Sequence, residues 1–183
     1  MKRHGWTILA LGLGLMTAGC ILTSGQIQIS FDLPSPFTAN SVTGIDGTTI
    51  DLNTESEYQD NKDKLKDLSD LAVLGKFTNN AATAVNVEVW MTPAATSHLT
   101  EAALRGDPTA IKLWGPFQVG PNATTVIDWN KSAALFTTAG KATLLAQAKG
   151  DGEFSIYAVG PAGAAYNFTV ENGALVLVID VGI

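Results

Sequence analysis

The sequence predicts an all-β protein, an antiparallel β-sandwich of the Ig-like or jelly-roll-like kind with one or two short helices. About nine short segments alternate polar and apolar residues, which is the period of a half-buried strand. Glycine, proline, asparagine and aspartate recur between these segments as turn residues. No long stretch has the 3.6-residue periodicity of an amphipathic helix. We expect one domain over residues 26–183, without internal repeats.

The first strands follow from alternation and from the residues that interrupt it. The segment Gln26–Leu33 reads polar-apolar four times over, and Pro34 and Pro36 end it. A short strand, Thr48–Leu52, follows the turn-forming pair Asp46-Gly47. Both segments therefore predict strands with one face toward solvent.

The next two strands are expected to form a hairpin. Leu71–Thr78 and Ala84–Thr92 lie on either side of Asn79-Asn80. In the second segment, valines and Met91 alternate with polar residues and Trp90, so Trp90 lies on the face opposite the valines.

Five further segments have strand character. They are Ile111–Val119, Thr124–Trp129, Glu153–Val159, Tyr166–Glu171 and Ala174–Val181. Asn172-Gly173 separates the last two and predicts a second hairpin. The final strand is apolar on both faces, and we expect it at the centre of a sheet, since an exposed edge of that kind would aggregate.

Two segments interrupt the strands with helical character. Residues 57–68 are polar, with Leu65 and Leu68 spaced three apart, and predict a short surface helix. Residues 131–149 are alanine-rich and predict one or two short helices with a break at Gly140.

The N-terminus has the composition of an export signal. A basic start at Lys2 and Arg3 precedes an apolar stretch, Trp6–Met16, that is too short to cross a bilayer. The ending Thr17-Ala18-Gly19-Cys20 resembles the lipobox of bacterial lipoproteins. The resemblance implies a signal peptide over residues 1–19, cleavage between Gly19 and Cys20, and acylation of Cys20, with residues 20–25 as a short tether. A plain secretory signal cut near Ala18, which leaves Cys20 as a free thiol, is the alternative.

The same resemblance predicts where the protein is located. Two or more acyl chains on Cys20 would hold the protein stably at a membrane, so the membrane is an expected partner. The residue after the cysteine is Ile21 and not aspartate, which among enteric lipoproteins favours the outer over the inner membrane. We therefore expect a lipid-anchored protein of the bacterial cell envelope.

Charge and cysteine content exclude some partners. The chain carries 11 basic and 17 acidic residues, and removal of residues 1–19 changes the net charge from −6 to −8 because Lys2 and Arg3 are lost. A chain this acidic repels polyanions, so we expect no nucleic-acid partner. With Cys20 as the only cysteine, no internal disulfide can form.

No motif in the sequence predicts catalysis or a cofactor. After cleavage His98 is the only histidine, and no serine lies in a Gly-x-Ser-x-Gly context. We expect His98 to be an exposed loop residue and the protein not to be an enzyme. A carboxylate-dependent hydrolase is the least favoured alternative, because sequence alone places no two carboxylates at the required separation.

Acidic and aromatic residues give two weaker site hypotheses. Asp46, Asp51 and Asp60 are weak calcium candidates, but their spacing does not match the EF-hand loop, and we expect solvated carboxylates and no metal. Trp90, Trp114 and Trp129 all lie in predicted strands. If at least two were exposed on one face they would form a ligand platform of the kind carbohydrate-binding modules use; otherwise they fill the core.

A second resemblance covers about forty residues and supports the fold only. The charged run Asp60–Leu68 and the later Thr78-Asn79-Asn80 resemble uncharacterised exported lipoproteins with a β-sandwich body, in which this asparagine phrase lies at a hairpin tip. The resulting hypothesis is a non-enzymatic lipoprotein with a binding or structural role at the envelope, and with a protein or glycan partner. Its expected contact loop is Pro93–Pro108, the longest irregular stretch between strands. A carbohydrate-binding module that uses the tryptophans is the alternative.

Overall fold

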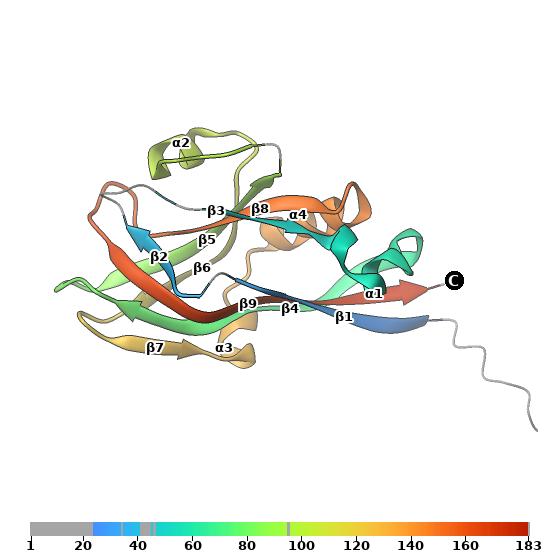
Figure 1. The fold of residues 1–183 in the computed structure, drawn as a ribbon, viewed down its shortest axis with the longest axis horizontal. Coiled ribbons are helices and arrows are strands. Elements are labelled where there is room, and N and C mark those ends of the chain that lie inside the picture. The colour runs from blue at the N-terminus through green and yellow to red at the C-terminus, as the bar shows by residue number, and fades with distance from the viewer. Residues whose placement is uncertain (1–23, 34, 41–44, 46, 95, 183) are drawn as a thin grey trace, which may run out of the picture.

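Two antiparallel sheets packed face to face form the protein, so the predicted all-β sandwich is confirmed (Figure 1). The structure is a computed structural model that describes residues 24–33, 35–40, 45, 47–94 and 96–182. One sheet, called sheet A below, has the strand order β1-β9-β4-β7, with β2 also paired to β9. The other, sheet B, has the order β3-β8-β5-β6.

The elements of both sheets are short except for the two long strands at the centre of sheet A. The strands of sheet A are β1 (Ser24–Asp32), β2 (Phe37–Asn40), β4 (Leu65–Asn79), β7 (Thr124–Ile127) and β9 (Asn167–Gly182). Those of sheet B are β3 (Gly47–Asp51), β5 (Val85–Pro93), β6 (Ile111–Val119) and β8 (Glu153–Val159).

Helices connect the strands and close the sides of the sandwich. The α-helices are α1 (Ser56–Gln59), α2 (Glu101–Gly106), α3 (Trp129–Ala133) and α4 (Thr138–Lys149), and the 3₁₀ helices are η1 (Leu52–Thr54) and η2 (Lys62–Lys64). Sequence reasoning did not predict β2 or α2.

The core lies between the inward faces of the two sheets. Leu175, Leu177 and Ile179 of β9 are fully buried, as are Val87 and Met91 of β5. Along β5, buried residues alternate with more exposed ones as far as Met91, which is the pattern that predicted this strand, whereas β9 is buried on both faces at residues 175–177. The prediction that the last strand is central is also confirmed, since β9 lies between β1 and β4.

The predicted hairpin around Asn79-Asn80 is wrong. The strand before it, β4, belongs to sheet A, and the strand after it, β5, belongs to sheet B, so the two do not pair. The segment 79–84 instead carries the chain from one sheet to the other. The side chain of Asn79 is buried in this connection. The residue that indicated a turn in the sequence therefore lies at the edge of the core.

The predicted hairpin at Asn172-Gly173 is also wrong, because β9 continues through this pair as one strand. Asn172 has a positive φ of 51°, and the β4–β9 register shifts between Leu74 and Lys76, opposite the pair. The two residues therefore form a bulge. A side chain at Gly173 would approach Leu33 and Val170 to about 3.2 Å, so close packing also favours glycine there.

The predicted helices are partly wrong. Residues 57–68 form only the end of α1 and the single turn η2, and Leu65 and Leu68 belong to β4 and bury their side chains. The segment 131–149 does contain two helices, but the break precedes Thr138. Gly140 lies inside α4, where the main chain of Leu113 leaves no room for a side chain.

Candidate functional site

The predicted lipidation residue, Cys20, and the predicted cleavage site between Gly19 and Cys20 lie outside the described residues, so acylation and cleavage stay predictions. The first described strand, β1, begins at Ser24, four positions after Cys20. A chain of four residues spans at most about 14 Å. An acyl group on Cys20 would therefore hold the start of β1 close to the membrane surface. Within the described part of the chain, no helix is long and apolar enough to cross a bilayer.

The predicted contact loop, Pro93–Pro108, contains a helix. The Thr100 hydroxyl accepts a hydrogen bond from the amide of Ala103 and caps the N-terminus of α2. Leu104 is fully buried and fixes the helix to the sandwich. In Figure 1, α2 lies toward the end of the molecule opposite the start of β1.

Arg105, a residue of α2, is the centre of an ion-pair network between this helix and sheet B. Its guanidinium donates to Glu101 at 2.5 Å, to Glu88 at 3.0 Å and to the carbonyl of Gly160 at 2.9 Å. The guanidinium carbon also lies 4.9 Å from the ring centroid of Trp90. Because Glu88 comes from β5, the network ties α2 to sheet B.

The network sets the ionisation of Glu88, whose side chain is 13% exposed. Burial acts to raise the pKa of this carboxyl, but the hydrogen bond from Trp90 and the charges of Arg105 and Lys112 outweigh burial and hold the pKa below its ordinary value. The pKa of Arg105 is raised in turn: burial acts to lower it, and the two glutamates prevail. Both groups are therefore charged near neutral pH.

His98 is not the exposed loop residue that the sequence predicted, because its side chain is only 10% exposed. Its Nε2 lies 2.9 Å from a carboxylate oxygen of Asp107. The Asp107 carboxylate also accepts from the hydroxyl and amide of Thr109, and these bonds, followed by His98, lower the pKa of Asp107. The Tyr157 hydroxyl accepts from the His98 amide and donates to the carbonyl of Thr96. His98, before α2, therefore connects the chain there to Asp107, after α2, and to Tyr157 of β8.

A shallow groove lies beside the network. It has a volume of about 540 Å³ and runs between α2 and the connection that follows β8. Its lining residues are Thr100, Glu101, Ala102, Arg105 and the run 162–165. Small side chains line most of the groove, so main-chain atoms and the paired charges of α2 are within reach of a bound segment.

The three tryptophans of the predicted ligand platform lie in different places. Trp114 of β6 is fully buried and donates to Ser132 of α3. Trp90 lies under Arg105 on sheet B and donates to Glu88. Trp129, predicted in a strand, begins α3 and donates to Asp70 of sheet A. No two of them form a shared platform, because each ring is tied to a different element.

The calcium candidates do not form a site in the part of the chain that is described. Asp51 accepts from the amide and side chain of Asn53 and caps η1, and Asp60 is exposed at the end of α1. Asp46 lies outside the described residues. Among the described residues, no three histidine, cysteine or acidic side chains lie together in a way that could hold a metal ion.

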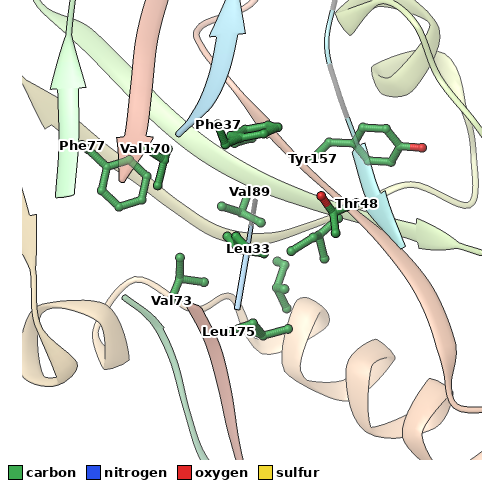
Figure 2. A pocket seen from close by; sticks show the side chains of 12 residues that line it. Leu33, Phe37, Thr48, Val73, Phe77, Val89, Tyr157, Val170 and Leu175 are labelled. Atoms are coloured by element: carbon green, nitrogen blue, oxygen red, sulfur yellow. The ribbon is translucent and has the colours of Figure 1, made fainter. Parts of the chain in front are cut away.

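An apolar cavity of about 30 Å³ lies between the sheets (Figure 2). Phe37, Leu33 and Tyr157 line one part of it, and Val73 and Leu175 another. In Figure 2 the labelled side chains with a hydroxyl are Thr48 and Tyr157. Pockets for small molecules are commonly about 300–1,000 Å³. A space of this size is therefore a packing gap in the core rather than a ligand site.

Comparison with known proteins assigns no family. No family model matches the chain, and no curated protein matches it. One similar solved structure is that of Desmodium yellow mottle tymovirus, 14% identical over the whole of this chain and 97% of that chain, with a TM-score of 0.23. The infectious bursal disease virus Gt and Gx strains give 13% and 12% identity and TM-scores of 0.24 and 0.25. The matches cover 86% and 85% of this chain but 31% and 32% of those chains. Scores of this size do not establish a shared fold and carry no argument about function.

Sequence reasoning missed the Arg105 network, although one signal was present. Glu101 and Arg105 have the i, i+4 spacing of a helical ion pair. The third partner, Glu88, is brought in by the tertiary fold from a strand seventeen positions earlier. No local pattern indicates that contact.

Proposed function

We propose that this protein is an exported lipoprotein of the bacterial cell envelope, anchored through Cys20, which acts by binding a partner and not by catalysis. The observation that carries the proposal is the placement of Cys20, in a lipobox-like sequence, four residues before β1 begins. A sandwich anchored at that end is held near the membrane and exposes its other end to the surroundings.

The α2 region supports a binding role. Its charged side chains are paired with one another, which gives a rigid surface. The groove between α2 and residues 162–165 is the hollow that this region offers to a partner. Rigid surfaces lose little conformational entropy on binding, so a structured region of this kind suits recognition.

The anchor is tested by metabolic labelling with a clickable palmitate analogue, followed by membrane fractionation. The wild-type chain and a Thr23→Ala control should both carry the label and co-fractionate with the outer membrane, whereas Cys20→Ala should lose the label. Unlabelled, soluble protein in all three cases would contradict the anchor and favour a secreted protein.

The contact surface is tested by placing a photo-cross-linking amino acid in cells at Ala102 or Ala164, with the exposed Ala142 of α4 as the control position. A cross-linked species that forms from both groove positions and not from Ala142 supports the groove as the contact. Equal cross-linking from all three positions would contradict it.

A further inference from the structure

The outward face of sheet A carries four threonines in one row across four strands. In the β2–β9 register Thr38 is opposite Thr169, in the β9–β4 register Thr169 is opposite Thr78, and in the β4–β7 register Thr78 is opposite Thr124. Residues directly opposite each other in antiparallel strands lie on the same face. The four threonines therefore form a continuous line of hydroxyl and methyl groups.

Four asparagines form a second row, next to the threonines and at the same end of the sheet. Asn40 is opposite Asn167 in the β2–β9 register. The amide of Asn80 donates to the carbonyl of Asn167 at 2.8 Å, and the amide of Asn122 donates to the carbonyl of Ala81 at 3.0 Å. These bonds continue the pairing of β4 with β9 and β7 beyond the ends of both registers, so all four asparagines follow the threonine row.

Both rows face away from the core. Phe168 and Asn79, which lie between the two rows along β9 and β4, are buried, as are Phe77 and Val170 on the other side of the threonines. Alternation therefore directs the two rows outward. The row on the other side of the threonines contains the ion pair Lys76–Glu171 and Val126, which is 59% exposed. The eight side chains of the two rows carry no charge.

Hydrogen bonds within the array hold its side chains in a defined arrangement. The hydroxyls of Thr78 and Thr124 lie 3.0 Å apart. The side-chain amide of Asn80 donates to the Thr169 hydroxyl at 2.9 Å and to the carbonyl oxygen of the Asn167 side chain at 3.3 Å. Hydroxyl and carboxamide groups can donate and accept at the same time, so groups bonded to each other retain capacity for an outside partner.

We propose that this face binds an uncharged polysaccharide. Such a polymer offers neutral hydroxyls that donate and accept, repeated at regular intervals, and the array repeats its own hydroxyls at the strand spacing of about 4.8 Å. Threonine methyls and Val126 provide apolar contact for the C–H groups of sugar rings. The absence of charge in both rows removes the electrostatic attraction that a charged glycan or a nucleic acid would use.

The proposal adds a second binding surface, distinct from the groove beside α2, and names its partner class. It rests on export, because extracellular glycans are met outside the cytoplasm. It does not rest on acylation. Failure of palmitate labelling would remove the anchor and leave glycan binding testable, and failure of glycan binding would leave the anchor intact.

The test uses the Cys20→Ala chain, purified from the exported fraction, in affinity electrophoresis and pull-down with amorphous cellulose, starch, chitin and mannan. At least one of these neutral polysaccharides should retain the protein, and high salt should not release it. Thr78→Val and Thr169→Val keep the shape and strand propensity of threonine but remove a hydroxyl. Each should weaken binding about fivefold, the loss of one hydrogen bond.

Thr49→Val, on the outward face of sheet B, is the matched control and should bind as the parent does. Retention by none of the four polysaccharides would overturn the proposal, and so would binding that the array variants leave unchanged. Sedimentation velocity provides a second readout. If the array variants change the oligomeric state and not glycan retention, the face is a self-association surface and the proposal fails.

Discussion

The connection around Asn79 and the α2 region both fix an irregular segment to the sandwich, but they do so by different chemistry. The Asn79 side chain is fully buried and bonds neutral main-chain groups: its nitrogen donates to the carbonyls of Thr83, Gly120 and Val119, and its oxygen accepts from the amide of Ala81. The α2 region is held by charges that are partly exposed, chiefly those around Arg105.

Because of this difference, the two regions should not tolerate substitutions equally well. A buried amide that is removed leaves main-chain donors and acceptors without partners and without water, which is costly whatever the pH or salt concentration. Partly exposed charges can be rehydrated when a partner is lost, so they contribute less and respond to pH and ionic strength. We therefore expect substitutions in the Asn79 connection to cost more stability than substitutions in the α2 region, and only the latter cost to vary with pH and ionic strength.

The largest effect should come from Asn79→Ala. The substitution leaves three carbonyls and one amide without the Asn79 side chain, and we expect a loss of about 3–5 kcal/mol in the free energy of unfolding. Asn80→Ala, at an exposed neighbour, should lose less than about 1 kcal/mol. Urea unfolding measures both. Equal losses for the two variants would show that the buried amide has no special role.

Ser132→Ala tests whether a second buried neutral group behaves like Asn79. The Ser132 hydroxyl accepts from the amide of Val73 at 2.7 Å and from the indole of Trp114 at 3.1 Å. Trp114 keeps its bond to the Ser132 carbonyl, whereas the Val73 amide loses its side-chain partner. We expect a loss of about 2 kcal/mol that is independent of salt, again by urea unfolding. A loss that salt abolishes would contradict this assignment.

Arg105→Ala should cost less than Ser132→Ala and should depend on salt. It leaves Glu88 and Glu101 without their cation, and because these groups are partly exposed we expect a loss of about 1–2 kcal/mol at low salt. Lys76→Ala breaks the exposed pair with Glu171 and should lose no more than about 0.5 kcal/mol. If Arg105→Ala lost more stability than Asn79→Ala, the charged α2 region would be the less tolerant of the two, contrary to our expectation.

The smallest effect should be the acid response of Glu88. Its folded pKa lies below the ordinary value of 4.5, so the stability that its charge contributes is fully present above that value and is lost as pH falls through the lower folded pKa. Glu88→Gln should flatten this part of the stability profile. Unfolding of both proteins across the acid range measures it, and parallel profiles would exclude Glu88 as a contributor.

Several strands could be predicted because their signal is local. Segments such as Glu153–Val159 were predicted with the bounds that the structure has, since alternation and flanking glycines are enough to define them. The two predicted hairpins failed because Asn-Gly and Asn-Asn mark positions where the backbone can turn, not what it pairs with afterwards. At Asn172-Gly173 the pairing of β9 with β4 continues on both sides, so the local irregularity becomes a bulge.

The site residues were predicted less well for the same reason. The sequence gives the same strand-like context to the three tryptophans. Only the tertiary packing decides that Trp114 is fully buried, that Trp90 bonds Glu88 on sheet B, and that Trp129 bonds Asp70 from the start of α3. His98 is largely buried against partners that no local pattern indicates, among them Asp107, on the other side of α2 along the chain.

By itself the sequence determined the strand-rich class and the apolar, inward-facing positions, because period-two alternation is a local consequence of strand geometry. It also supplied the lipobox-like segment, on which the anchoring proposal depends. Only the tertiary structure decided which strands pair, where Asn79 and Arg105 find their partners, and that four threonines from four strands share one row. These features join residues far apart in the chain, and such contacts follow from the packing of the whole sandwich rather than from any local pattern.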